Sequence, residues 1–175
     1  MGKIIKNSRD PREFFTPQMS TYDNLGVAWH PYIMFFQEAN YISEIVNTDK
    51  FGFRFSTYKN NHFSPYSNFN KSDNHVSFVV GSSAVFGVGA TNDSNTISSL
   101  LTNINGEKYL NFGCRAHVSS QELILFNQIS PNFRKIKNVI IFSGLNDLYL
   151  SFLRNYSGEL GPFFFGKQYS NCMNK

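Results

Sequence analysis

The chain has 175 residues, which is enough for one domain with a substantial core, and 41% of them are apolar. Its net charge is +4, and the Lys and Arg residues are scattered along the sequence. The densest basic group, Arg134, Lys135 and Lys137, precedes an apolar run and is interpreted as a solvated loop. This pattern argues against a specific nucleic-acid partner.

The cysteines and the apolar runs exclude several other classes. Cys114 and Cys172 lie far apart and fit no metal or redox spacing. The first ten residues, MGKIIKNSRD, lack the apolar core of a signal peptide, and no apolar run approaches the length of a membrane span. We therefore expect a cytoplasmic protein with no membrane partner.

The sequence divides into two regions of different character. Residues 1–74 are rich in Asn, Phe and Tyr and show no regular period, so we expect an irregular, aromatic-rich N-terminal extension, with 58–74 as a connecting loop. Residues 75–175 are regular from Val76 onward and are expected to form an α/β domain.

Three short apolar runs in the second region are typical of buried strands, at 76–80, 109–112 and 138–142. Helical spacing is found at 97–104 and again at 119–129, where Ser119 and Glu122 match a capping box. This β-α-β-α-β order predicts a parallel sheet with right-handed crossovers. We expect a three-layer arrangement in which the three strands have the order 2-1-3.

Small and polar residues follow each of these strands, at Gly81 to Ser83, at Gly113 and at Gly144 to Asp147. Ligands of parallel sheets bind beyond the carboxyl ends of the strands, so the three clusters are expected to converge. Taken singly, each has a plainer interpretation: serines that stabilise a turn, a turn glycine, or a helix cap. The first cluster fits neither the P-loop nor the dinucleotide-binding pattern.

Together the clusters resemble the SGNH (GDSL-like) hydrolase family. Ser83 matches the family's nucleophile, Gly113 its second-block glycine, and Gly144-Leu145-Asn146-Asp147 its G-x-N-D block. The resemblance implies a three-layer, flavodoxin-like α/β fold and hydrolysis of acyl esters, or acyl transfer, without a metal or an organic cofactor. Ser83 would attack the ester carbonyl, and the N–H groups of Ser83 and Gly113 with the Asn146 amide would stabilise the oxyanion.

The expected substrate class follows from the same resemblance. It implies a small O-acyl ester, and 30–32 and 52–54 resemble the segment that precedes the first block in some carbohydrate-linked members. A carbohydrate O-acetyl ester is one substrate of this kind.

The family's fourth signature, D-x-x-H, is absent from the sequence, and the last strands of a flavodoxin-like sheet are missing as well. His30, His62, His75 and His117 all precede the third block, and none has an Asp three residues before it. His117 is a weak candidate for a substitute base, and a surface or packing role is favoured for all four. Two interpretations remain: an impaired serine ester hydrolase, or an inactive or truncated relative that acts by binding and could self-associate through the exposed edge of its third strand.

Overall fold

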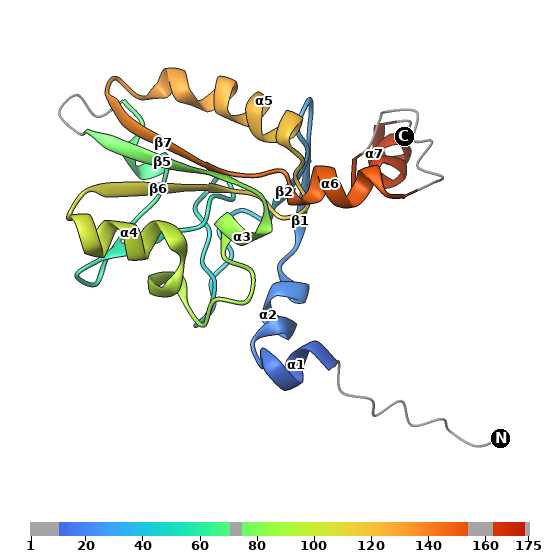
Figure 1. Cartoon of the computed structure of the whole chain (residues 1–175), viewed down its shortest axis with the longest axis horizontal. Coiled ribbons are helices and arrows are strands. Elements are labelled where there is room, and N and C mark those ends of the chain that lie inside the picture. The colour runs from blue at the N-terminus through green and yellow to red at the C-terminus, as the bar shows by residue number, and fades with distance from the viewer. Residues whose placement is uncertain (1–10, 71–74, 154–162, 174–175) are drawn as a thin grey trace.

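The computed structural model of the chain describes residues 11–70, 75–153 and 163–173. Its central element is a parallel sheet of three strands, β5 (Val76–Gly81), β6 (Lys108–Gly113) and β7 (Ile136–Phe142), in the order β6-β5-β7 (Figure 1). The predicted parallel sheet and its strand order are therefore confirmed. Gly81 pairs with both Gly113 and Phe142, so the three strands end at one common edge.

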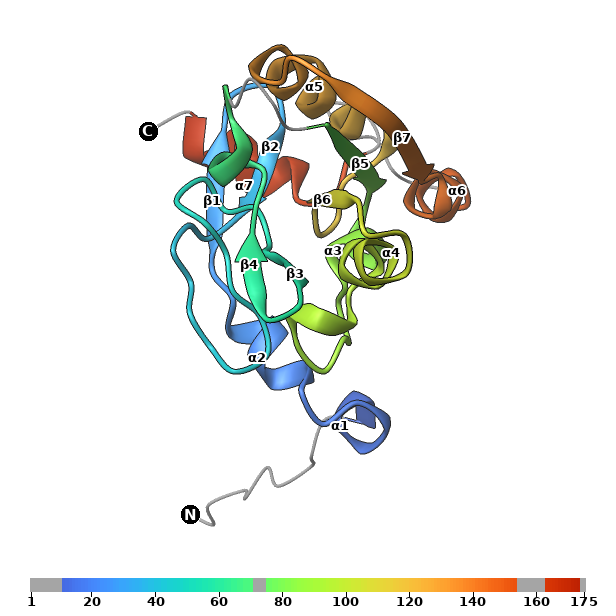
Figure 2. The same ribbon diagram turned by 90° about the vertical axis from the view of Figure 1, so that its left-hand side faces the viewer.

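Helices cover both faces of this sheet (Figure 2). Helix α5 (Ser119–Ile129) lies on one face, while α3 (Ser83–Phe86) and α4 (Ile97–Asn105) lie on the other. The central strand β5 is buried along its whole length because alternate residues face opposite layers. Phe78 packs in the cluster that contains Leu125 of α5, and Val79 in the cluster that contains Val85 of α3. Burial on both sides explains why this strand is almost entirely apolar.

The N-terminal region is more regular than its sequence suggests. It contains two short helices, two antiparallel hairpins and a 3-10 turn: α1 (Pro11–Phe15), α2 (Met19–Asn24), β1 (Val27–His30) with β2 (Met34–Gln37), β3 (Ser56–Tyr58) with β4 (Asn61–Phe63), and η1 (Tyr66–Asn68). The expected loop at 58–74 is therefore wrong over β4, and 71–74 lie outside the described residues. Strands of three or four residues are too short to show an alternating pattern.

One hydrophobic cluster is shared by the N-terminal region and the sheet. Phe53 contacts Phe112 of β6 edge to face, with ring centroids 5.4 Å apart, and Phe112 packs against Phe78 of β5 at 4.3 Å. Phe35 and Phe36 of β2 belong to the same cluster. The high aromatic content of the chain is thus used to join the N-terminal hairpins to the sheet, where large rings bury much area.

The start of α5 differs in detail from the expected capping box. The residue that caps the helix is Val118, whose N–H donates to Gln121 Oε1 at 3.2 Å. Ser119 instead donates its hydroxyl to Asp147 at 2.6 Å. The Ser119–Glu122 assignment is therefore wrong, because a long-range carboxylate competes for the serine.

Strand β7 forms an edge of the sheet, and among the described residues no strand pairs with its outer side. Four successive apolar residues, Val139 to Phe142, remain exposed, with Ile141 at 71%. Helix α6 (Leu145–Ser151) follows directly, and α7 (Gly166–Met173) packs its Tyr169 ring against Trp29 of β1. The remaining short elements are η2 (Asp93–Asn95) and η3 (Ser130–Asn132). In the described part of the chain, every helix falls short of the length and apolarity needed to cross a bilayer.

Candidate active site

Ser83 is the first residue of α3, immediately beyond the end of β5. Gly81 turns the chain there, and a side chain at this position would collide with the Phe142 carbonyl and with Val85. The helix ends at Gly87, whose φ of 89° suits glycine. Ser82 is buried, whereas Ser83 is only partly covered. Of the two neighbouring serines, Ser83 is therefore the one that a substrate could reach.

Gly113 ends β6 opposite Gly81, but its N–H is already engaged. It donates to Asn111 Oδ1 at 2.9 Å, and Asn111 Nδ2 in turn donates to the Val85 carbonyl at 3.0 Å. The bridge ties the end of β6 to α3, and a Cβ at Gly113 would collide with the backbone of Phe86. Close packing alone thus accounts for this glycine. Its expected role as an oxyanion donor stays a prediction that requires the Asn111 side chain to turn away.

Asn146 lies in the first turn of α6 and is partly buried. Its Nδ2 donates to the His117 carbonyl at 2.7 Å. The next residue, Asp147, accepts from the Ser119 backbone N–H at 3.0 Å and from the Ser119 hydroxyl. The Asn-Asp pair therefore binds the loop that follows β6, which brings the second and third sequence clusters into contact. Asn146 could serve an oxyanion only by giving up its bond to His117.

His117 is fully buried, and its ring is committed to packing. Nε2 lies 2.7 Å from the Phe35 carbonyl, which can only accept, so the proton is on Nε2. Nδ1 has no hydrogen-bond partner among the described residues. Burial lowers the pKa of His117 to about 4. The other three histidines are exposed. A packing role for His117 and surface positions for His30, His62 and His75 agree with the expectation from the sequence.

A buried carboxyl, Glu122, lies close to the same edge. Burial raises its pKa, the nearby Asp147 carboxylate raises it further, and the Ser143 hydroxyl opposes this. Neither carboxyl oxygen has a protein hydrogen bond of good geometry among the described residues. Among the residues of this edge that the structure describes, Glu122 has an environment that favours the protonated form, and no sequence motif marks it as part of a site. Glu122 lies in a predicted helix, and the helical pattern does not indicate that its side chain is buried.

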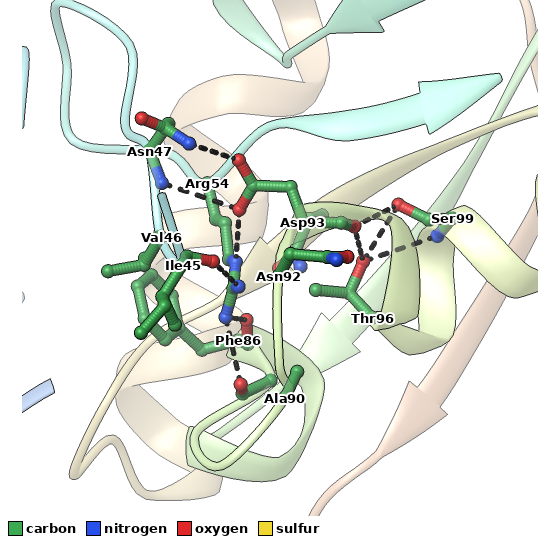
Figure 3. Close-up of polar contacts among 12 residues, drawn as sticks. Ile45, Val46, Asn47, Arg54, Phe86, Ala90, Asn92, Asp93, Thr96 and Ser99 are labelled. Carbon is green, nitrogen blue, oxygen red and sulfur yellow. Dashed lines mark hydrogen bonds and ion pairs between the residues drawn. The ribbon is translucent and has the colours of Figure 1, made fainter. Parts of the chain in front are cut away.

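A buried arginine holds the far end of α3 (Figure 3). Arg54 is fully buried; its Nε donates to Asp93 at 2.8 Å, and its Nη1 donates to the carbonyls of Phe86 and Gly87. Asp93 also accepts from the Asn47 side chain at 2.7 Å. The network links the N-terminal region to the loop after α3, so it fixes the helix on which Ser83 lies. The only sequence signal of this network is a charged residue, Arg54, within an apolar run.

The described residues also limit the chemistry of this edge. Within 11–70, 75–153 and 163–173, no three His, Cys, Asp or Glu side chains lie close enough together to hold a metal ion. Cys114 is buried, and burial raises the pKa of its thiol well above the ordinary value, which disfavours the thiolate. This edge therefore offers the Ser83 hydroxyl, the Asn146 amide and the Glu122 carboxyl, beside the hydrogen-bonded pair of Ser119 and Asp147.

The protonation of His117 leads to the first prediction. Because its pKa is about 4 in the folded state and 6.5 in the reference state, the unfolded chain binds more protons between these values. Stability should therefore fall as the pH drops from 6.5 toward 4, by on the order of 3 kcal/mol from this residue. Urea unfolding of the wild type and His117→Gln across that range measures it. An equal pH slope in both proteins would show that another group is responsible.

Comparison of the sequence with models of known protein families finds no match, and comparison with curated proteins finds no relative.

Proposed function

We propose that the carboxyl edge of the sheet carries the nucleophile and oxyanion part of a serine ester hydrolase site of the SGNH type, impaired in this chain because it lacks a base. The proposal rests on where three residues lie in the sheet. Gly113 is the last residue of β6, and Ser83 and Asn146 lie just beyond the ends of the adjacent parallel strands β5 and β7, where ligands of such sheets bind. The flavodoxin-like relationship and the small O-acyl ester substrate belong to the same proposal and rest on the motif resemblance.

The chemistry assigns each group one task. The Ser83 oxygen attacks the ester carbonyl while its proton passes to solvent water, which makes the step slow in this chain. The developing oxyanion accepts from the Ser83 N–H at the start of α3 and from the Asn146 amide. When the tetrahedral intermediate collapses, the ester C–O bond breaks, the alcohol leaves and the acyl group stays on Ser83. To bind the oxyanion, the Asn146 amide must give up its hydrogen bond to the His117 carbonyl. The loss of one ordinary hydrogen bond costs a net free energy of about 1 kcal/mol. An oxyanion donor contributes about 2.7–4 kcal/mol, so the exchange stays favourable.

The test replaces the nucleophile with one that needs no base. A thiol is intrinsically nucleophilic and partly ionised near neutral pH, so Ser83→Cys can be acylated without a histidine. We expect an aryl acetate to acylate the introduced thiol about 10-fold faster or more, per thiolate, than a free thiol, because the oxyanion is stabilised. Ser82→Cys is the matched control, and Cys172→Ser removes the exposed thiol from both. Equal rates for the two variants would refute the assignment of Ser83.

A second candidate function is interaction with a second copy of the chain through β7. The exposed apolar side chains of Val139 to Phe142 continue onto α6 through Leu145, Leu148 and Tyr149. Because successive strand residues point to opposite faces, the exposed side chains of β7 lie on both sides of its free edge. Contiguous exposed apolar surface is typical of interaction sites. An unpaired strand edge adds backbone donors and acceptors.

Sedimentation of the full chain tests this candidate. We expect a dimer at micromolar concentration that Ile141→Lys dissociates, because a charge would be buried in the paired edges. Ile104→Lys, an equally exposed position on α4, is the matched control and should leave the dimer intact. A wild-type chain that is monomeric at these concentrations would eliminate the candidate.

A further inference from the structure

A second site of different character lies between the N-terminal hairpin and α5. A cavity of about 530 Å³ opens there, bounded on one side by the turn at Pro31 to Ile33 and on the other by Leu125, Gln128 and Ile129 of α5. Asn132, also in its wall, accepts from the Asn70 N–H through its backbone carbonyl. Ser83 is absent from the lining residues that the structure describes, so this cavity is separate from the candidate active site. Its volume is within the range of small-molecule pockets.

The wall of this cavity is aromatic and uncharged. Six aromatic side chains line it: Tyr32, Phe36, Phe51, Phe53, Tyr66 and Phe69. Apart from the hydroxyl groups of the two tyrosines, the polar side chains are those of His30, Gln128 and Asn132, and no Asp, Glu, Lys or Arg is among the lining residues described. Lys50 brings a charge close to this wall, and its Nζ already lies 4.0 Å from the centre of the Tyr66 ring. A cation would therefore lose its hydration without gaining an ion pair, and an anion would have to compete with that ring for Lys50. Neutral ligands with flat apolar faces are favoured instead.

The turn at the mouth is strained and firmly held. Tyr32 (φ 70°) and Met34 (φ 65°) are the centres of two consecutive three-residue turns, closed by bonds from Ile33 N to Pro31 O and from Phe35 N to Ile33 O. Such turns are rare for residues other than glycine. Two buried side chains stabilise them, since Gln121 donates to the Ile33 carbonyl and His117 to the Phe35 carbonyl. The geometry keeps the Tyr32 ring, 76% exposed, beside the opening.

We propose that this cavity binds an uncharged aromatic molecule of two or three rings that carries one hydrogen-bonding group. The size follows from the volume, since an apolar cavity of about 150 Å³ accommodates benzene. The hydrogen-bonding group is matched by Gln128 and Asn132, which lie on the same side of the cavity at the end of α5. A saccharide fits less well, because each sugar ring carries several hydroxyl groups and most of the cavity wall is apolar. A linear acyl chain would leave the ring faces without a planar partner.

The probe for this proposal is N-phenyl-1-naphthylamine, a neutral three-ring dye that becomes fluorescent in apolar surroundings. The full chain should bind it saturably with one site. Gln128→Trp, at an exposed position that lines the cavity, should fill the space and weaken binding about 10-fold or more. Asn127→Trp is the matched control, next to it on α5 and outside the lining, and its affinity should stay within about twofold.

Two further comparisons make the outcome decisive. Leu123→Trp alters a separate apolar cavity of about 440 Å³ beside β7 and should leave the affinity unchanged. If Leu123→Trp abolishes binding while Gln128→Trp does not, the dye occupies the other cavity and the proposal is overturned. In competition, 2-naphthol should displace the dye at a lower concentration than 1-decanol or maltose. Stronger displacement by the alcohol or the sugar would overturn the assigned ligand class.

Discussion

The chain as it stands is expected to hydrolyse aryl acetates about 10⁶-fold more slowly than an enzyme with an intact serine triad. A serine hydroxyl is a weak nucleophile at neutral pH and needs a base to take its proton during attack. No histidine follows the third motif, and His117 donates from Nε2 to the Phe35 carbonyl, buried and with a pKa of about 4. Substrate binding and the oxyanion donors should still accelerate hydrolysis roughly 10³- to 10⁴-fold over the reaction in water.

Turnover of an aryl acetate by the wild type and by Ser83→Ala measures this. We expect the two to differ little, and a chain extended by a segment that carries Asp-x-x-His to be active. Robust Ser83-dependent turnover by the 175-residue chain alone would contradict the account. It would place a working base within this sequence, and His117 and Glu122 would be the first residues to replace.

Arg54→Met is expected to lower the free energy of unfolding by about 3–5 kcal/mol, because it leaves Asp93 as an uncompensated buried carboxylate. Arg54 and Asp93 are 0% and 3% exposed, and their atoms Nε and Oδ1 lie 2.8 Å apart. The substitution also removes the donors to the carbonyls of Phe86 and Gly87 at the end of α3. The substitution should therefore lower the stability of the chain and also displace the helix on which Ser83 lies.

The matched control is Arg12→Met, which breaks an ion pair with Asp23 whose side chains are about half exposed. An exposed pair contributes about 1 kcal/mol or less, so this variant should unfold nearly as the wild type does. Urea denaturation of both variants gives the comparison. Similar small losses for both would mean that the buried network does not hold α3.

The sheet could be predicted because its sequence signal is local. Val76 to Val80 is apolar throughout apart from Ser77 and ends at a glycine, and the spacing of Ile97, Leu101 and Ile104 identifies the crossover helix. The right-handed crossover rule then predicts that the strands run parallel. The hairpins of the N-terminal region lacked such a signal. Strands of three or four residues take their stability from packing against Phe78 and Phe112, which are distant in the sequence.

The candidate site was predictable in position and not in detail. Motif order places Ser83, Gly113 and Asn146 after three strands, and parallel pairing brings those ends to one edge. Whether a donor is free depends on side-chain contacts that no motif records. Asn111 takes the Gly113 N–H, and the His117 carbonyl takes the Asn146 amide. The partner of Arg54, which lies 39 residues away, was equally invisible because a salt bridge leaves no spacing pattern.

The most direct test of the hydrolase assignment is the acylation rate of Ser83→Cys with and without Asn146→Ala, measured per thiolate with an aryl acetate in the Cys172→Ser background. If Asn146 stabilises the oxyanion, the second substitution should slow acylation by about 10-fold or more, after the cost of its bond to His117. Ser82→Cys should show no such dependence. Equal acylation rates with asparagine and alanine at position 146 would contradict the assignment.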